Sequence, residues 1–142
     1  MITANRYHDI CAGHRVVGHE GKCRNLHGHN YRFHFKVEPT EGLDSIGRVL
    51  DFSVIKHLLC TWLENMWEHK MLIWVDDPLL PALQQIDSNI VKVTFNPTAE
   101  NIAEYFVETI APRLLREYPA RLVELTLEET RKCSVTYKIK QP

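Results

Sequence analysis

The sequence predicts an α+β domain in which two helices cover one face of a four-stranded antiparallel sheet. Three observations support this fold class. One segment alternates apolar and polar residues with a period of two, two later segments repeat apolar residues at helical spacing, and the predicted elements follow the order strands, helix, short strand, helix, strands. The 142 residues suffice for one core, so we expect a single domain over residues 1–142.

The first two predicted strands lie at residues 6–14 and 30–38, and a glycine-containing loop joins them. The second strand is the clearer one. Its apolar positions, which alternate with polar residues, are Tyr31, Phe33, Phe35 and Val37. This alternation is typical of a strand with one buried face.

Two amphipathic helices are predicted after these strands. The first covers residues 53–66, and Asp51 or Ser53 is expected to accept from the free N–H groups at its start. The second begins after Thr98, a plausible N-cap, and Pro112 is expected to kink or interrupt it. The apolar residues at four-residue steps in the second helix are Ile102, Phe106, Ile110 and Leu114.

The remaining segments complete the predicted sheet. Residues 74–89 contain two prolines and are expected to form a long loop with room for one helical turn. Residues 91–95 alternate and predict a short strand. Two closing strands are predicted at 121–129 and 133–139, separated by a turn at 130–132.

Composition limits the classes of function. The net charge of −1 and the isoelectric point of about 6.7 argue against general affinity for nucleic acid or for anionic membranes. No apolar run resembles a signal peptide or approaches the ~20 residues that span a bilayer. The four cysteines form no Cys-x-x-Cys pair, which indicates free thiols in a reducing compartment. We therefore expect a cytoplasmic protein.

The strongest chemical signal is the sequence His27-Gly28-His29. Residues two apart on an extended chain point to the same side, so both imidazoles continue the apolar face of the following strand. Buried imidazoles need partners, and a metal ion satisfies both, with Gly28 leaving room for close approach. The alternative is a pair of surface histidines at a strand start.

His14 ends the preceding strand and is the expected third ligand, and His19 is a rival in a loop expected to be exposed. Three neutral nitrogens with an open fourth position are typical of catalytic zinc. Cys23 has two functional interpretations. It is either a fourth ligand that closes a structural site or a free thiol whose pKa a nearby cation lowers. A third possibility is an ordinary small residue in a loop.

A family resemblance starts from residues 23–31, which read Cys-Arg-Asn-Leu-His-Gly-His-Asn-Tyr. This segment resembles the signature of the 6-pyruvoyl-tetrahydropterin synthase and 6-carboxytetrahydropterin synthase superfamily. Weaker matches follow in the right order at residues 10–14, 51–56, 68–69, 96–100 and 128–130. The three residues between Cys23 and His27 resemble the bacterial queuosine-pathway branch. Glu68 departs from the pattern, because aspartate is usual there.

The resemblance implies the tunnelling fold, in which sheets join into a barrel, and a homo-oligomer, specifically a hexamer, with active sites between subunits. It implies zinc held by His14, His27 and His29. The implied substrate is 7,8-dihydroneopterin triphosphate. The implied products are 6-carboxytetrahydropterin, acetaldehyde and triphosphate, in queuosine biosynthesis.

The reaction implied by the resemblance needs acid–base groups on both sides of the substrate. Cys23 is one candidate, and His69 supported by the charge of Glu68 is the other. From the residues alone, Glu68 and His69 would be read as an exposed helix end, where a protonated histidine is favourable anyway. The triphosphate site has no firm prediction, and Lys22, Arg24 and Arg15 are candidates only.

Glu129 is predicted to bind the substrate. It shares its strand face with Val123, Leu125 and Leu127, so its carboxylate should point inward and need a partner. A pterin offers an amino group and a ring N–H side by side, which match two carboxylate oxygens. The alternative is that the strand ends at Glu128 and that Glu129 is solvated. By contrast, Glu100 reads as an acid in the first turn of a helix.

Two other functions remain open at this point. The first is 6-pyruvoyl-tetrahydropterin formation from the same substrate, which only the products distinguish. The second is a non-catalytic domain stabilised by zinc, with Cys23 as fourth ligand.

Overall fold

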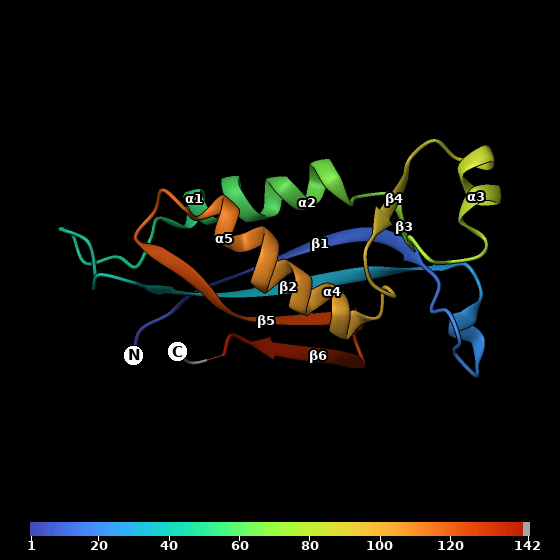
Figure 1. The fold of residues 1–142 in the computed structure, drawn as a ribbon. Coiled ribbons are helices and arrows are strands. Elements are labelled where there is room, and N and C mark those ends of the chain that lie inside the picture. The colour runs from blue at the N-terminus through green and yellow to red at the C-terminus, as the bar shows by residue number, and fades with distance from the viewer. Residues whose placement is uncertain (141–142) are drawn as a thin grey trace.

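The computed structural model describes residues 1–140 as a six-stranded sheet with two long helical segments packed against one face (Figure 1). The strands are β1 (Ala4–His14), β2 (His27–Pro39), β3 (Met71–Trp74), β4 (Ile90–Val93), β5 (Ala120–Thr130) and β6 (Cys133–Lys138), in the order β4-β3-β1-β2-β5-β6. Strands β1, β2, β5 and β6 pair antiparallel, as predicted. Strands β3 and β4 extend the sheet by parallel pairing beside β1. The α+β fold class is confirmed, and the predicted count of four strands is too low.

Strand β3 is absent from the sequence prediction because it is covered on both faces. Leu72 belongs to the main core, whereas Ile73 packs on the other side against Leu80 and Leu83 of helix α3 (Leu80–Ile86). A strand buried on both sides does not alternate, and four apolar residues alone give no periodic signal. Helix α3 occupies much of the segment that was predicted as a long loop.

Two long helical segments lie across the covered face. The first joins α1 (Phe52–Ile55), η2 (Lys56–Cys60) and α2 (Thr61–Met66), and the second joins α4 (Ala99–Tyr105), η3 (Phe106–Ile110) and α5 (Ala111–Leu114). The predicted caps are present. The Asp51 carboxylate accepts from the N–H of Ser53 at 2.8 Å, and the Thr98 hydroxyl accepts from the N–H of Asn101 at 3.1 Å.

Pro112 does not end the second helix, which continues to Leu114. The turn before it, η3, is a wider π turn in which the N–H of Ala111 donates to the carbonyl of Phe106. Proline lacks an N–H and clashes with the preceding turn of a regular helix. The wider turn accommodates this misfit, so the helix changes its pitch and remains unbroken.

The core lies between the helices and the inner face of β2 and β5. Four alternating β2 residues, each at most 2% exposed, form its centre: Tyr31, Phe33, Phe35 and Val37. Phe35 stacks on Phe106 of η3, with ring centroids 5.5 Å apart. A β-bulge in the β2–β5 ladder moves the inward position from Val123 to Leu122. The prediction that Val123 shares the buried face is therefore wrong.

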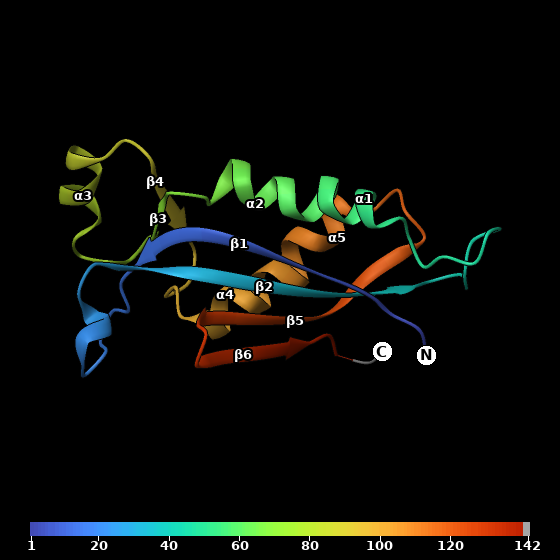
Figure 2. The same ribbon diagram turned by 180° about the vertical axis from the view of Figure 1, so that it is seen from behind.

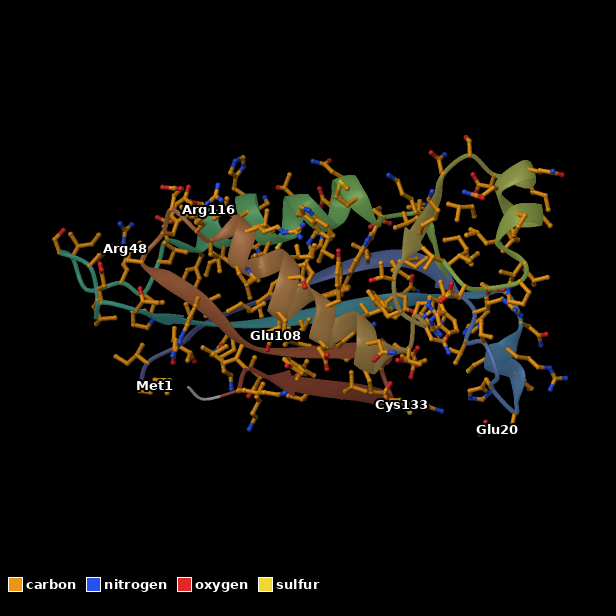
Figure 3. The ribbon with its side chains drawn as sticks, in the orientation of Figure 1. Met1, Glu20, Arg48, Glu108, Arg116 and Cys133 are labelled. Atoms are coloured by element: carbon orange, nitrogen blue, oxygen red, sulfur yellow. The ribbon has the colours of Figure 1, made fainter. Side chains whose placement is uncertain are left out.

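The other face of the sheet carries polar side chains, and the two long helical segments leave it uncovered (Figure 2). Among the described helices, α3 packs on this side, against Ile73 of β3. There Arg32 forms a two-pronged ion pair with Asp9, with N–O distances of 2.8 and 3.0 Å. The loop between β1 and β2 projects beyond one end of the sheet, with Glu20 at its outer part (Figure 3). Across residues 1–140, no helix has the length and apolar character needed to cross a membrane.

Candidate metal centre

Three histidines converge where β1 and β2 meet the β1–β2 loop. His14 is directly opposite His27 in the antiparallel ladder, and Ala12 is opposite His29. This register places the three imidazoles on the helix-covered face. One nitrogen from each of His14, His27 and His29 lies within 4.8 Å of the other two.

The hydrogen bonds of Nδ1 in His14 and His27 determine the tautomer of each ring and so the protonation of Nε2. Nδ1 of His14 lies 2.6 Å from the carbonyl of Pro97, and Nδ1 of His27 lies 2.7 Å from the carbonyl of Asn25. A carbonyl only accepts, so each Nδ1 carries the proton. Each Nε2 is then an acceptor, yet the two Nε2 atoms face each other at 3.0 Å. Two facing lone pairs need a cation between them, and this arrangement fits a metal ion.

Burial favours the neutral, metal-binding form of these rings. His14 is fully buried, and desolvation lowers its pKa to about 4, against the opposing effect of the Pro97 carbonyl. Burial also lowers the pKa of His29, although the nearby Glu129 carboxylate acts in the opposite direction. The buried Nε2 of His29 has no hydrogen-bond partner. This unpartnered nitrogen and the nitrogens of His14 and His27 together form a three-nitrogen donor set of the kind that zinc prefers.

Glu129 points its carboxylate toward this cluster. Its Oε2 lies 3.5 Å from Nε2 of His14 and 3.7 Å from Nε2 of His29. Its neighbour Glu128 points to the other face of the sheet, where it contacts His34 and Arg131. The two glutamates therefore lie in different environments, although they are adjacent in sequence.

Tyr31 is a member of the site that sequence reasoning placed only in the apolar core. Its ring lies 5.3 Å from that of His29, centroid to centroid, and its hydroxyl is buried with no partner. Burial, together with the charges of Glu129 and Cys23, raises the pKa of this hydroxyl. The signal was available in the sequence, because Tyr31 has the same parity as His27 and His29.

Cys23 lies near the cluster but outside the set of ligand atoms. It belongs to the short helix η1 (Lys22–Arg24) and is half-buried, and its carbonyl accepts from the N–H of Val16 at 2.8 Å. This bond folds the loop back toward the end of β1. Within residues 1–140, the ligand group at this end of the sheet contains only His14, His27 and His29.

Glu68 and His69 lie elsewhere in the chain's own fold. They gather with Cys11, and one ligand atom from each residue lies within 4.8 Å of the other two. Cys11 pairs with Asn30 in the ladder, one position from the pair of Ala12 and His29. Because alternate residues point to opposite faces, this group is separated from the three histidines by the sheet.

The structure gives His19, Arg15 and Gly28 roles that differ from those predicted. His19 is half-buried, and its Nδ1 accepts from the N–H of Gly21 at 2.8 Å, so it organises the loop and is not in the cluster. Arg15 is held by Asp77 through two bonds of 2.6 and 2.8 Å and also donates to a backbone carbonyl, which commits its guanidinium to the fold. Gly28 faces away from the cluster, and a Cβ there would lie 3.2 Å from the carbonyl of Ala12. The absence of a side chain at Gly28 therefore lets β1 approach β2 closely, and it does not make room for a metal.

Comparison with known proteins identifies the family of this chain. The profile of 6-pyruvoyl tetrahydropterin synthase matches residues 3–140. A protein of Rickettsia typhi named 6-carboxy-5,6,7,8-tetrahydropterin synthase is 35% identical over 139 residues, covering 95% of this chain and 99% of that relative. A protein of the same name from Aquifex aeolicus is 34% identical over 130 residues, covering 82% and 76%.

Solved structures share the fold. The 6-pyruvoyl tetrahydropterin synthase of Caenorhabditis elegans superposes with a TM-score of 0.67 and 27% identity, covering 98% of this chain and 96% of that one. An uncharacterized protein of Wolinella succinogenes superposes with a TM-score of 0.85 over 98% of both chains, at 22% identity.

Proposed function

This chain belongs to the 6-pyruvoyl tetrahydropterin synthase family, and from this premise we propose that it is a zinc-dependent 6-carboxy-5,6,7,8-tetrahydropterin synthase. The proposed reaction converts 7,8-dihydroneopterin triphosphate to 6-carboxytetrahydropterin, acetaldehyde and triphosphate, in queuosine biosynthesis in the cytoplasm. The observation that carries the proposal is the partly buried group of His14, His27 and His29 with a carboxylate beside it.

The three histidines would hold the zinc. Their outer nitrogens donate to the carbonyls of Pro97 and Asn25, which orients two of the rings before any metal arrives. Bound zinc supplies a Lewis acid that lowers the pKa of substrate hydroxyls. Glu129 would anchor the pterin, because its two oxygens match the amino group and ring N–H of that heterocycle. Its position beside the cluster sets the distance between anchor and metal.

Proton transfer is assigned to Cys23 and His69. Cys23 lies on the loop that folds back toward β1, near Tyr31 and outside the ligand group, and so stays available as a base. His69 would be the second acid–base group, and Glu68, 3.1 Å from its Nε2, would orient it and support its charge.

The separation of His69 from the histidine cluster supports a shared site. In one chain the sheet lies between them, so both groups reach one substrate only if a neighbouring subunit supplies His69. We propose a homo-oligomer, a hexamer, in which the zinc side of one subunit meets the His69 side of the next. The exposed polar face of the sheet would then line the inside of a barrel.

The test is product analysis. Purified protein loaded with one zinc per chain is incubated with dihydroneopterin triphosphate, and the products are separated and identified by mass spectrometry. The expected products are 6-carboxytetrahydropterin and acetaldehyde. A 6-pyruvoyl product would assign the chain to the other activity of its family. No turnover by the zinc-loaded protein would contradict the catalytic proposal and favour a zinc-stabilised binding domain.

A further inference from the structure

We propose that Cys11, Glu68 and His69 form a second zinc site and that zinc bound there inhibits the enzyme. The binding site stands on its own geometry. The inhibition rests on the proposed function, because it uses the assignment of His69 to proton transfer.

The geometry of the three side chains suits a small divalent cation. A thiol, a carboxylate and an imidazole each offer one ligand atom, and the three atoms lie within 4.8 Å of one another. Zinc binds sulfur at about 2.3 Å and nitrogen or oxygen at about 2.0–2.2 Å in a tetrahedron, which places ligand atoms roughly 3.3–3.7 Å apart. Small side-chain rotations therefore close the group around an ion.

The backbone already holds the group together. The N–H of Cys11 donates to Oε1 of Glu68 at 3.1 Å, and the N–H of His69 donates to the carbonyl of Cys11 at 2.6 Å. His69 has a φ of 59°, the only positive φ found at a non-glycine residue in the described chain. A residue with a side chain adopts this left-handed conformation only at an energetic cost. The contacts with Cys11 keep it there, so the imidazole is presented beside the thiol.

In a single chain the site is open to an incoming ion. Cys11 and His69 are exposed, and a cavity of about 410 Å³ is lined by Cys11, Asn30, His69 and Met71, among others. The thiol of Cys11 donates to Oδ1 of Asn30 at 2.9 Å. On binding, the thiol would release its proton to solvent and the thiolate would coordinate the ion. A thiolate with an imidazole and one carboxylate favours zinc over magnesium or calcium.

This site differs from the three-histidine centre in chemistry and in consequence. The histidine centre is partly buried and offers nitrogen only, whereas the second group is largely exposed and offers sulfur. A zinc ion on the second group would occupy the His69 imidazole and deprive it of its acid–base role. The expected effect at saturation is a loss of roughly 10²-fold or more in rate, the usual cost of removing one such group.

Metal stoichiometry tests the binding. Protein stripped with a chelator is titrated with zinc by calorimetry and, in parallel, with Co²⁺, whose thiolate charge-transfer band reports sulfur ligation. Wild type is expected to bind two ions per chain, one of them with the thiolate band. Cys11→Ser should bind one ion and lose the band. Cys133→Ser is the matched control, because Cys133 is an exposed thiol at the start of the edge strand β6 (Figure 3), and it should behave as wild type.

His14→Ala separates the two sites, because it should lose the histidine centre and keep the thiolate band. One ion per chain in wild type, or a thiolate band that survives in Cys11→Ser, would overturn the second site. The activity arm compares turnover with and without excess zinc. Wild type and Cys133→Ser should be inhibited, whereas Cys11→Ser should not. Equal inhibition of Cys11→Ser would overturn the inhibitory role. If no variant turns over the pterin substrate, the proposed function fails, while the stoichiometry still decides the site.

Discussion

Hydrogen bonds to single histidine nitrogens explain why the cluster is ready for a metal. Each Nδ1 of His14 and His27 donates to a backbone carbonyl, so the inner nitrogens face one another as acceptors. The carbonyls belong to Pro97 and Asn25, in segments far apart along the chain. The backbone therefore selects the tautomer of each ring. Because the acceptors are main-chain carbonyls, changing the side chain of Pro97 or Asn25 would not remove them.

Protonation of His14 should make the metal-free protein sensitive to acid. Burial lowers its pKa from 6.5 to about 4, so below pH 6.5 the unfolded chain binds a proton that the folded chain does not. The free energy of unfolding should therefore fall as the pH drops from 6.5 to about 4, by roughly 2–3 kcal/mol for this group. Chemical denaturation of chelator-treated protein across this range measures the slope. His14→Gln should flatten it, whereas His57→Gln, at an exposed position, should not.

Glu129→Gln should weaken substrate binding and leave the zinc content unchanged. The amide keeps the shape of the side chain, but it loses the charge and places a donor opposite a donor. The loss of a charge-assisted pair costs roughly 1.5–3 kcal/mol, which is about 10- to 100-fold in KM. Glu128→Gln is the matched control, because that carboxylate points to the other face of the sheet. Equal kinetics in the two variants would mean that the pterin is anchored elsewhere.

At the scale of elements, the segment at the start of α4 completes the surroundings of the histidine cluster. Asn96 holds the loop that follows β1 by accepting from the N–H of Val17 at 3.0 Å and donating to its carbonyl at 2.9 Å. Pro97 follows with the carbonyl that orients His14, and Thr98 then caps the helix. One short segment therefore joins the helix layer to the end of the sheet where the histidines lie.

Removal of the Thr98 cap should loosen this connection. Thr98→Ala leaves an N–H of the first turn without its side-chain acceptor and should cost about 1 kcal/mol of stability. Zinc affinity should fall as well, because the adjacent carbonyl of Pro97 orients His14. Thermal unfolding and zinc titration measure the two effects. Ser53→Ala near the other helix start is the control, since it should alter stability little and zinc affinity not at all. A stable Thr98→Ala protein with unchanged zinc affinity would count against this link.

At the scale of the whole molecule, the two faces of the sheet carry different parts of the proposed site. The histidine cluster, Glu129 and Tyr31 lie on the helix-covered side, and Glu68 and His69 lie with Cys11 across the sheet. A single chain therefore holds both halves of the proposed chemistry without joining them. In the proposed homo-oligomer, a second copy would bring the two halves to one substrate.

Subunit mixing tests this arrangement. Cys23→Ala and His69→Ala should each be inactive, and each should retain the zinc of the histidine centre. When the two variants are unfolded together and reassembled, roughly a quarter of the sites at random subunit contacts should combine an intact Cys23 with an intact His69. Activity should return to about that fraction of wild type. Mixtures that stay inactive, although native mass spectrometry shows mixed oligomers, would place both residues in one subunit's own site.

The sequence alone predicted what depends on local periodicity. Alternation in β2 identified its buried face and, by parity, the shared side of His27 and His29, while Asp51 and Thr98 identified the helix starts. These features follow from the geometry of a strand or of one helical turn, which neighbouring residues determine. The family signature around Cys23 then predicted the fold, which the structure and the comparisons confirm.

Tertiary structure decided the features that depend on contacts between distant segments. Strand β3 is buried on both sides and so carries no periodic signal, and the bulge at Val123 appears only when β5 is laid against β2. The carbonyl of Pro97 reaches His14, which is 83 positions away in the chain, through packing alone. His69 groups with Cys11 on the far side of the sheet from the histidine cluster, and this grouping depends on strand register. Register is set when distant strands pair, so the sequence of either strand alone does not determine it.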